Sequence, residues 1–228
     1  MIIAIDGPSG AGKSTIGRML ARRLGLLYID TGAMYRAGGL AVNEAQISTT
    51  DVEAVAGIVA KATIRLEGHP DSLRVFLNDR DVSDEIRSEQ VGHTASVIAA
   101  QPDVRREMVR QQRGAGEEAQ SAGSGAVIDG RDIGTVVFPD ADLKVFLTAT
   151  AEQRATRRFE EERVRLRSLT FEETLRDINI RDQRDSTRTD SPLVPADDAV
   201  TIDTTNLGIN EVLDQILALV NEKMGNRV

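Results

Sequence analysis

A glycine-rich segment near the N-terminus has the spacing of a phosphate-binding loop. Residues 7–14 are Gly-Pro-Ser-Gly-Ala-Gly-Lys-Ser, which matches the pattern G-x-x-x-x-G-K-S. The apolar run from Ile2 to Ile5 precedes this loop, and a stretch with helical apolar spacing follows it. In that setting the backbone N–H groups surround a phosphate, Lys13 reaches the β- and γ-phosphates and the Ser14 hydroxyl binds Mg²⁺. The segment therefore predicts a nucleoside triphosphate site.

Asp6, directly before the loop, has two interpretations that the sequence leaves open. Its carboxylate either helps to hold the hydration shell of the Mg²⁺ ion or simply ends the strand. The residues expected to bind the nucleotide are Gly7, Pro8, Ser9, Gly10, Ala11, Gly12, Lys13, Ser14 and Thr15, with Ser14 as the metal ligand.

Arginine and acidic residues recur where other predicted strands end. Asp30-Thr31-Gly32 follows one apolar run and is followed by Arg36, and the segment 129–132 (Asp-Gly-Arg-Asp) follows another. Ligands of open α/β sheets bind beyond the carboxyl ends of the strands, so these residues are placed to meet a second anion. For Thr31 and Arg36 the alternative is a helix cap with a solvated arginine.

The pattern Thr170-x-x-Glu173 predicts a capping box that opens a helix, and this helix changes from apolar to charged along one face. At the helical rotation of about 100° per residue, Ile178 and Asp185 fall on the same stripe of this helix. Arg181 and Arg188 lie to one side of that stripe. Charges that join an apolar stripe indicate either a polar pocket or an internal salt bridge, and both interpretations remain open.

Another predicted helix, opened by Thr150, carries arginines at helical spacing. Arg154, Arg157 and Arg158 stand at positions i, i+3 and i+4. They fit a charged surface helix with i,i+4 pairs, and equally a closing lid that neutralises the phosphoryl group being transferred. Further arginines follow along this segment at Arg163, Arg165 and Arg167.

Strands that alternate with helices must position these groups. Apolar runs at 2–5, 26–29, 126–129, 143–147 and 199–202 predict strands with helical segments between them. This order predicts an α/β fold with a central parallel sheet covered by helices on both faces. Residues 62–101 break the pattern and predict a small inserted unit. Pro102 begins a helix to about Gln112, and 114–125 is expected to be a flexible, solvated loop.

Composition narrows the class of protein. The 228 residues carry a net charge of −8, which argues against general nucleic-acid binding, and contain no cysteine, which suits a reducing compartment. No apolar run approaches the roughly 18 residues of a membrane span, and the N-terminus has no signal-peptide pattern. We therefore expect a cytoplasmic, unprocessed protein that binds neither nucleic acid nor membrane.

Four motifs together resemble the bacterial cytidylate (CMP) kinases. They are IDGPSGAGKST at 5–15, DTGAMYR at 30–36, DGRDIGTVVFPDAD at 129–142, and RDQRDSTR with SPLVP within 181–195. The resemblance extends over nearly the whole chain. It implies a P-loop kinase fold and the transfer of phosphate from ATP to CMP or dCMP with Mg²⁺. One departure is Thr31, where serine is expected.

The resemblance also implies roles for individual residues. It places Thr31, Arg36 and Arg131 on the CMP phosphate, Arg181 and Asp185 on the ribose, Ser96, Arg105, Asp132 and Arg188 around cytosine, Gly130 in the same substrate site, and Arg154, Arg157 and Arg158 in a lid. Lys13, Arg131 and the lid arginines are the expected catalytic residues. The expected core comprises 1–35, 102–150 and 171–228, the nucleoside monophosphate region 36–101 and the lid 151–170, in a monomer.

Two other functions stay possible at this level. One is a P-loop kinase for UMP or a non-nucleotide acid, and the other is a nucleotide-dependent switch. The range of phosphoryl acceptors distinguishes all three. No general base is needed for CMP, because a phosphate monoester with a second pKa near 6 is already largely dianionic.

Overall fold

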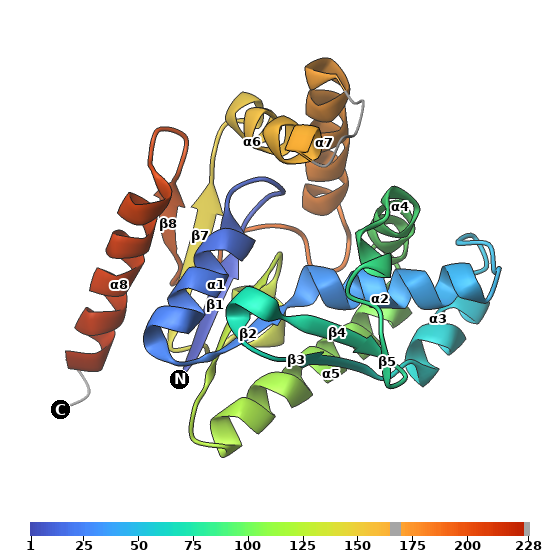
Figure 1. The fold of residues 1–228 in the computed structure, drawn as a ribbon, viewed down its shortest axis with the longest axis horizontal. Coiled ribbons are helices and arrows are strands. Elements are labelled where there is room, and N and C mark those ends of the chain that lie inside the picture. The colour runs from blue at the N-terminus through green and yellow to red at the C-terminus, as the bar shows by residue number, and fades with distance from the viewer. Residues whose placement is uncertain (165–169, 226–228) are drawn as a thin grey trace. The chain divides into compact units, whose positions relative to one another are not determined.

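The computed structural model describes residues 1–164 and 170–225. The fold is α/β, with a five-stranded sheet in the order β2-β6-β1-β7-β8 flanked by helices (Figure 1). Its strands are β1 (Ile2–Asp6), β2 (Leu27–Asp30), β6 (Ala126–Gly130), β7 (Leu143–Thr148) and β8 (Val200–Asp203). The pairs β1·β7, β2·β6 and β7·β8 are parallel. The predicted parallel sheet is confirmed, and each predicted strand end lies within one residue of the observed one.

The central strands are buried along their whole length. Every residue of β1 and β6 is buried, and Ile3, Ile5 and Ile128 have no exposed surface. A parallel strand covered on both faces reads as a continuous apolar run instead of an alternating one, which is why these strands stand out in the sequence.

The chain forms two compact units, and the first contains Met1–Ile2 and Ala21–Asp129. Its helices are α2 (Thr31–Glu44), α3 (Val52–Lys61), α4 (Glu89–Ile98) and α5 (Pro102–Ser121), with short 3₁₀ turns at Pro70–Ser72 and Glu85–Arg87. The predicted insert holds a three-stranded antiparallel sheet of β3 (Ile64–Glu67), β4 (Arg74–Leu77) and β5 (Arg80–Asp81). Asn78 and Asp79, both with positive φ, make the turn between β4 and β5.

The second unit contains Ile3–Leu20 and the chain from Gly130 onward. Its helices are α1 (Lys13–Leu24, whose last turn belongs to the first unit), α6 (Ala151–Val164), α7 (Phe171–Ser186) and α8 (Ile209–Gly225), with a π-helical turn at Ile133–Val137. The predicted capping box of α7 is confirmed, because Thr170 and Glu173 each accept a hydrogen bond from the other's backbone N–H.

The expected flexible loop at 114–125 is wrong for most of its length. Helix α5 continues from Pro102 to Ser121 and includes Gly114. Gln112, Gly116 and Ala119 are buried at helical spacing on one face. Because this face consists of small and polar residues, it has no apolar pattern that the sequence could reveal. Tertiary packing overrides the low helix propensity of Gly114 and Gly116.

Candidate active site

The phosphate-binding loop connects β1 to α1, as the sequence predicted. Gly7, Gly10 and Gly12 have positive φ, and helix α1 begins at Lys13. A Cβ atom on Gly7 would lie 2.0 Å from the carbonyl oxygen of Leu147, so only glycine fits there.

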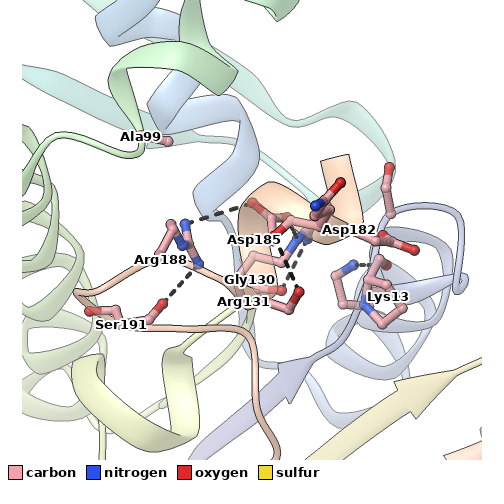
Figure 2. Close-up of polar contacts among 12 residues, drawn as sticks. Lys13, Ala99, Gly130, Arg131, Asp182, Asp185, Arg188 and Ser191 are labelled. Atoms are coloured by element: carbon pink, nitrogen blue, oxygen red, sulfur yellow. Dashed lines mark hydrogen bonds and ion pairs between the residues drawn. The ribbon is translucent and has the colours of Figure 1, made fainter. Parts of the chain in front are cut away.

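Side chains from three places hold the carbonyl groups of this loop. The Lys13 Nζ donates to the Pro8 carbonyl at 2.7 Å (Figure 2), and an Arg154 Nη donates to that of Ser9 at 3.2 Å. The Thr204 hydroxyl shares its proton between the carbonyls of Ala11 at 3.3 Å and Thr148 at 3.1 Å. In a trans peptide the N–H of the following residue points away from the carbonyl. The N–H groups of the residues after the loop carbonyls therefore turn away from the three donors, which leaves them for an anion at the start of α1.

Asp6 ties the loop to the turn that follows β6. Its two carboxylate oxygens accept the backbone N–H groups of Ile133 and Gly134, both at 2.8 Å. Burial raises the pKa of Asp6 to about 6, and the nearby Asp132 acts in the same direction, whereas the two N–H groups and Lys13 oppose it. Of the two interpretations of Asp6, these contacts favour the strand-end anchor.

The second unit also brings together the charged residues from two motifs. The Arg131 Nε donates to the Asp185 carboxylate at 2.9 Å, and an Arg188 Nη lies 3.8 Å from its other oxygen (Figure 2). Backbone carbonyls hold the same guanidinium groups, those of Gly130 at 3.2 Å and Ser191 at 2.9 Å. The sequence left open whether these charges line a polar pocket or form an internal salt bridge, and the structure contains the salt bridge. The shared carboxylate also orients two guanidinium groups that are predicted to bind the acceptor.

The electrostatics of this cluster keep Asp185 ionised. Burial acts to raise the pKa of Asp185, but the positive charges of Arg131, Arg181 and Arg188 hold it below the ordinary value. Asp132, also predicted to bind substrate, is buried in the first position after Arg131.

The arginines of α6 divide into two groups. Arg154 and Arg157 face inward, where Arg154 contacts the phosphate loop and Arg157 donates to the Thr204 hydroxyl at 2.9 Å. Arg158 and Arg163 make surface pairs with Glu161 and Glu160, at 3.8 and 3.6 Å, as the charged-helix interpretation expects. Two further arginines of this segment, Arg165 and Arg167, lie outside the described residues, as does the part of the predicted lid at 165–169.

The first unit holds the remaining predicted site residues. The Thr31 hydroxyl donates to the Asp129 carbonyl at 2.6 Å, and Asp30, not Thr31, caps helix α2. An Arg36 Nη donates to the Ile86 carbonyl at 3.1 Å.

Helices α4 and α5 carry the other two residues expected around cytosine. Ser96 lies on α4. Arg105 is buried on α5, where it donates to the Ala99 carbonyl at 3.0 Å and lies 5.9 Å from the ring centre of Tyr35 on α2. An arginine over an aromatic ring is fixed in direction by the packing as well as by the hydrogen bond.

Comparison with known proteins identifies the family. A family model described as cytidylate kinase matches residues 3–222. The chain belongs to the cytidylate kinase family. The cytidylate kinase of Desulfitobacterium hafniense (strain Y51) is 49% identical over 97% of this chain and 93% of its own. That of Halalkalibacterium halodurans is 46% identical over 98% of this chain and 99% of its own.

One solved structure has a similar fold. A protein from Eubacterium ventriosum superposes with a TM-score of 0.52 at 13% identity, covering 97% of this chain and 98% of that one. As a cytidylate kinase family member, the chain is a nucleoside monophosphate kinase that phosphorylates CMP with ATP and uses a divalent metal. The other P-loop kinase and the nucleotide switch are not favoured. No helix among the described residues could span a membrane.

Two residues that hold the candidate site were not singled out from the sequence. Thr204 follows β8 without any motif around it. Asp182 stands beside Arg181 in the RDQRD segment, and its helical position opposite α6 becomes clear only once α6 and α7 are paired. Asp6 was singled out, but its partners were not, because they lie in a turn more than 120 residues away along the chain, as its hydrogen bond to Ile133 shows.

Proposed function

We propose that this chain transfers the γ-phosphoryl group of ATP, with Mg²⁺, directly to the phosphate of CMP or dCMP while both nucleotides are bound. The observation that carries the proposal is in the second unit. There the amide groups of the phosphate loop turn away from three holding side chains, and Arg131 and Arg188 are aligned by one buried carboxylate. The oriented loop and Arg131 position phosphates and neutralise their charge, which is what phosphoryl transfer requires, and Arg188 is held beside them.

The donor is bound by the loop and by Lys13. The Lys13 Nζ carries three N–H donors, so it can bind phosphate oxygens of ATP while it donates to the Pro8 carbonyl. Within the described residues no cluster of three acidic or histidine side chains could hold a metal. This fits an ion held by the Ser14 hydroxyl, phosphate oxygens and water. When bound, Mg²⁺ neutralises charge on the phosphate oxygens.

The acceptor needs charge and orientation instead of a base. A phosphate monoester is largely dianionic at neutral pH because its second pKa is about 6. Arg131 and Arg36 bind this dianion together with the Thr31 hydroxyl, while Arg181 and Asp185 bind the ribose. The cytosine contacts are assigned to Ser96, Arg105, Asp132 and Arg188, and Gly130 is assigned to the substrate site as a whole.

The α6 arginines act on the donor side. Arg158, partly exposed on the helix, neutralises charge on the phosphoryl group. Arg154 supports the phosphate loop through the Ser9 carbonyl, and Arg157 does so through the Thr204 hydroxyl. We further assign the core to 1–35, 102–150 and 171–228, the acceptor region to 36–101 and the lid to 151–170.

Release of ADP in a coupled assay tests this function. With ATP and Mg²⁺, we expect turnover with CMP and dCMP well above that with UMP, AMP or GMP, and none without an acceptor. Lys13→Ala should remove most of the transfer whatever the acceptor, and EDTA should abolish it. Equal use of UMP would contradict the cytosine assignments, and full activity in Lys13→Ala would contradict the donor assignment.

The proposed monomer has a separate test. Light scattering after size exclusion should give the mass of one chain, 24.7 kDa. A mass twice as large at micromolar concentration would contradict it.

A further inference from the structure

Arg154 is a buried cation shared among three segments of the second unit. Its side chain is 6% exposed and its guanidinium meets three acceptors. The Nε donates to the Ala149 carbonyl at 2.9 Å, one Nη donates to the Ser9 carbonyl at 3.2 Å, and the other lies 2.6 Å from the carboxylate of Asp182 on α7. Only the last of these partners is charged.

The contact with Ser9 determines where the next amide points. Because the peptide is planar, an arginine that holds the Ser9 carbonyl turns the Gly10 N–H to the opposite side, toward the phosphates that the loop binds. The backbone of Arg154 reinforces this, since a Cβ atom on Gly10 would lie 3.0 Å from both the Cβ and the carbonyl oxygen of Arg154. The loop is thus packed directly on the first turn of α6.

Asp182 contacts Arg154 through one of its two carboxylate oxygens. Its Oδ2 pairs with Arg154, whereas its Oδ1 is shielded from solvent and accepts no hydrogen bond from the residues at 1–164 and 170–225. A guanidinium can rotate about its last bonds, and a charged partner on the far side fixes which nitrogen faces Ser9. Figure 2 shows Asp182 on the same helix as Asp185, which serves the arginines of the acceptor site.

We infer that Asp182 is a positioning residue for ATP, which acts through Arg154 to orient the Ser9–Gly10 peptide of the phosphate loop. The inference rests on the proposed function of that loop. Helix α7 then carries two carboxylates with different roles. Asp185 orients the arginines of the acceptor site, and Asp182 orients the arginine that holds the ATP-binding loop.

Calorimetric titration of the full-length protein with Mg·ATP, and separately with CMP, tests this assignment. Asp182→Ala should raise the Kd for ATP at least about fivefold and leave the Kd for CMP within twofold. Asp182→Asn, which keeps an acceptor oxygen, should have an intermediate Kd. Asp177→Ala, an exposed carboxylate of the same helix, is the matched control and should bind both nucleotides like the wild type.

A double-mutant cycle with Arg154→Ala tests the route of the effect. If Asp182 acts through Arg154, the double variant should bind ATP no more weakly than Arg154→Ala alone. Additive losses, an ATP affinity of Asp182→Ala equal to that of Asp177→Ala, or equal weakening of ATP and CMP would each overturn the inference. If Asp182→Ala does not fold, Asp182→Asn carries the same comparisons. A wild-type protein that fails to bind ATP would instead contradict the proposed function of the loop.

Discussion

At the scale of single residues, the second unit uses carboxylates to align arginines. Asp185 is paired with Arg131 and Arg188, and Asp182 with Arg154. A buried ion pair is weak evidence for stability, because desolvation offsets much of the Coulomb attraction. Its value here is geometric, since each pair gives the guanidinium a defined direction.

Truncating the acceptor arginines should reduce catalysis more than folding. We expect Arg131→Ala and Arg188→Ala each to lower kcat/KM for CMP at least about tenfold, which corresponds to about 1.4 kcal/mol of transition-state stabilisation. Steady-state kinetics with varied CMP at saturating ATP measures this. Arg176→Ala, an exposed arginine of α7, is the control. Kinetics equal to the control in both variants would contradict the proposed acceptor site.

Asp6 should make stability fall as the pH rises from acid toward neutral. Its pKa rises from 3.8 in the unfolded chain to about 6 in the fold. The native state therefore binds more protons between these values, and the stabilisation from the neutral form is lost as the pH passes about 6. Relative to Asp6→Asn, the wild type should lose up to about 3 kcal/mol between pH 4 and 7, at 1.36 kcal/mol per pKa unit.

Urea denaturation of wild type and Asp6→Asn at several pH values gives this difference, in which the titrations of other groups cancel. Asp177→Asn, at an exposed carboxylate of α7, is the matched control for the loss of one acidic side chain. A difference that stays constant from pH 4 to 8 would show that the anchor is ionised throughout.

At the scale of elements, the signals that could be read from the sequence were local. The phosphate loop, the capping box at Thr170 and the apolar strands depend on residues within a few positions, and the structure confirms them. The contacts of Arg154 with Ser9 and of Arg157 with Thr204 join residues 145 and 47 positions apart, so helical spacing left the role of these arginines undecided. The start of helix α5 at Pro102 was predicted, but its continuation beyond Gln112 was missed, because the buried face there consists of the small residues Gly116 and Ala119.

Helix α5 offers a test of this correction. Gly114 is exposed in the helix, and an added Cβ would meet no atom within 4 Å. Because alanine favours the helix interior over glycine by about 0.8–1 kcal/mol, Gly114→Ala should raise the free energy of unfolding by up to that amount. Denaturant unfolding measures it. At Gly123, just past the helix and with positive φ, the same change should destabilise the protein. No gain at Gly114 would restore the loop interpretation.

At the scale of the whole molecule, the fold class could be predicted because strands and helices alternate along the chain, and the family motifs fixed the activity. The partners of Asp6, Asp182 and Thr204 could not be predicted, because each depends on tertiary packing that no periodicity encodes. The net charge of −8 adds a global constraint: anions must be bound by local groups, against an unfavourable overall field.

This constraint predicts which anions stabilise the protein. Mg·ATP at 100 times its Kd should stabilise the fold by about 2.7 kcal/mol. For a chain of this size that corresponds to a rise in Tm of roughly 5–10 °C. Double-stranded DNA at the same phosphate concentration should leave the Tm unchanged, since an acidic surface offers no extended basic face to neutralise its backbone. Thermal scans with each ligand make the comparison, with Lys13→Ala as the control expected to lose most of the ATP shift. A rise in Tm with DNA equal to that with Mg·ATP would contradict the expectation that the protein does not bind nucleic acid. It would also show that anions are bound elsewhere than at the phosphate loop.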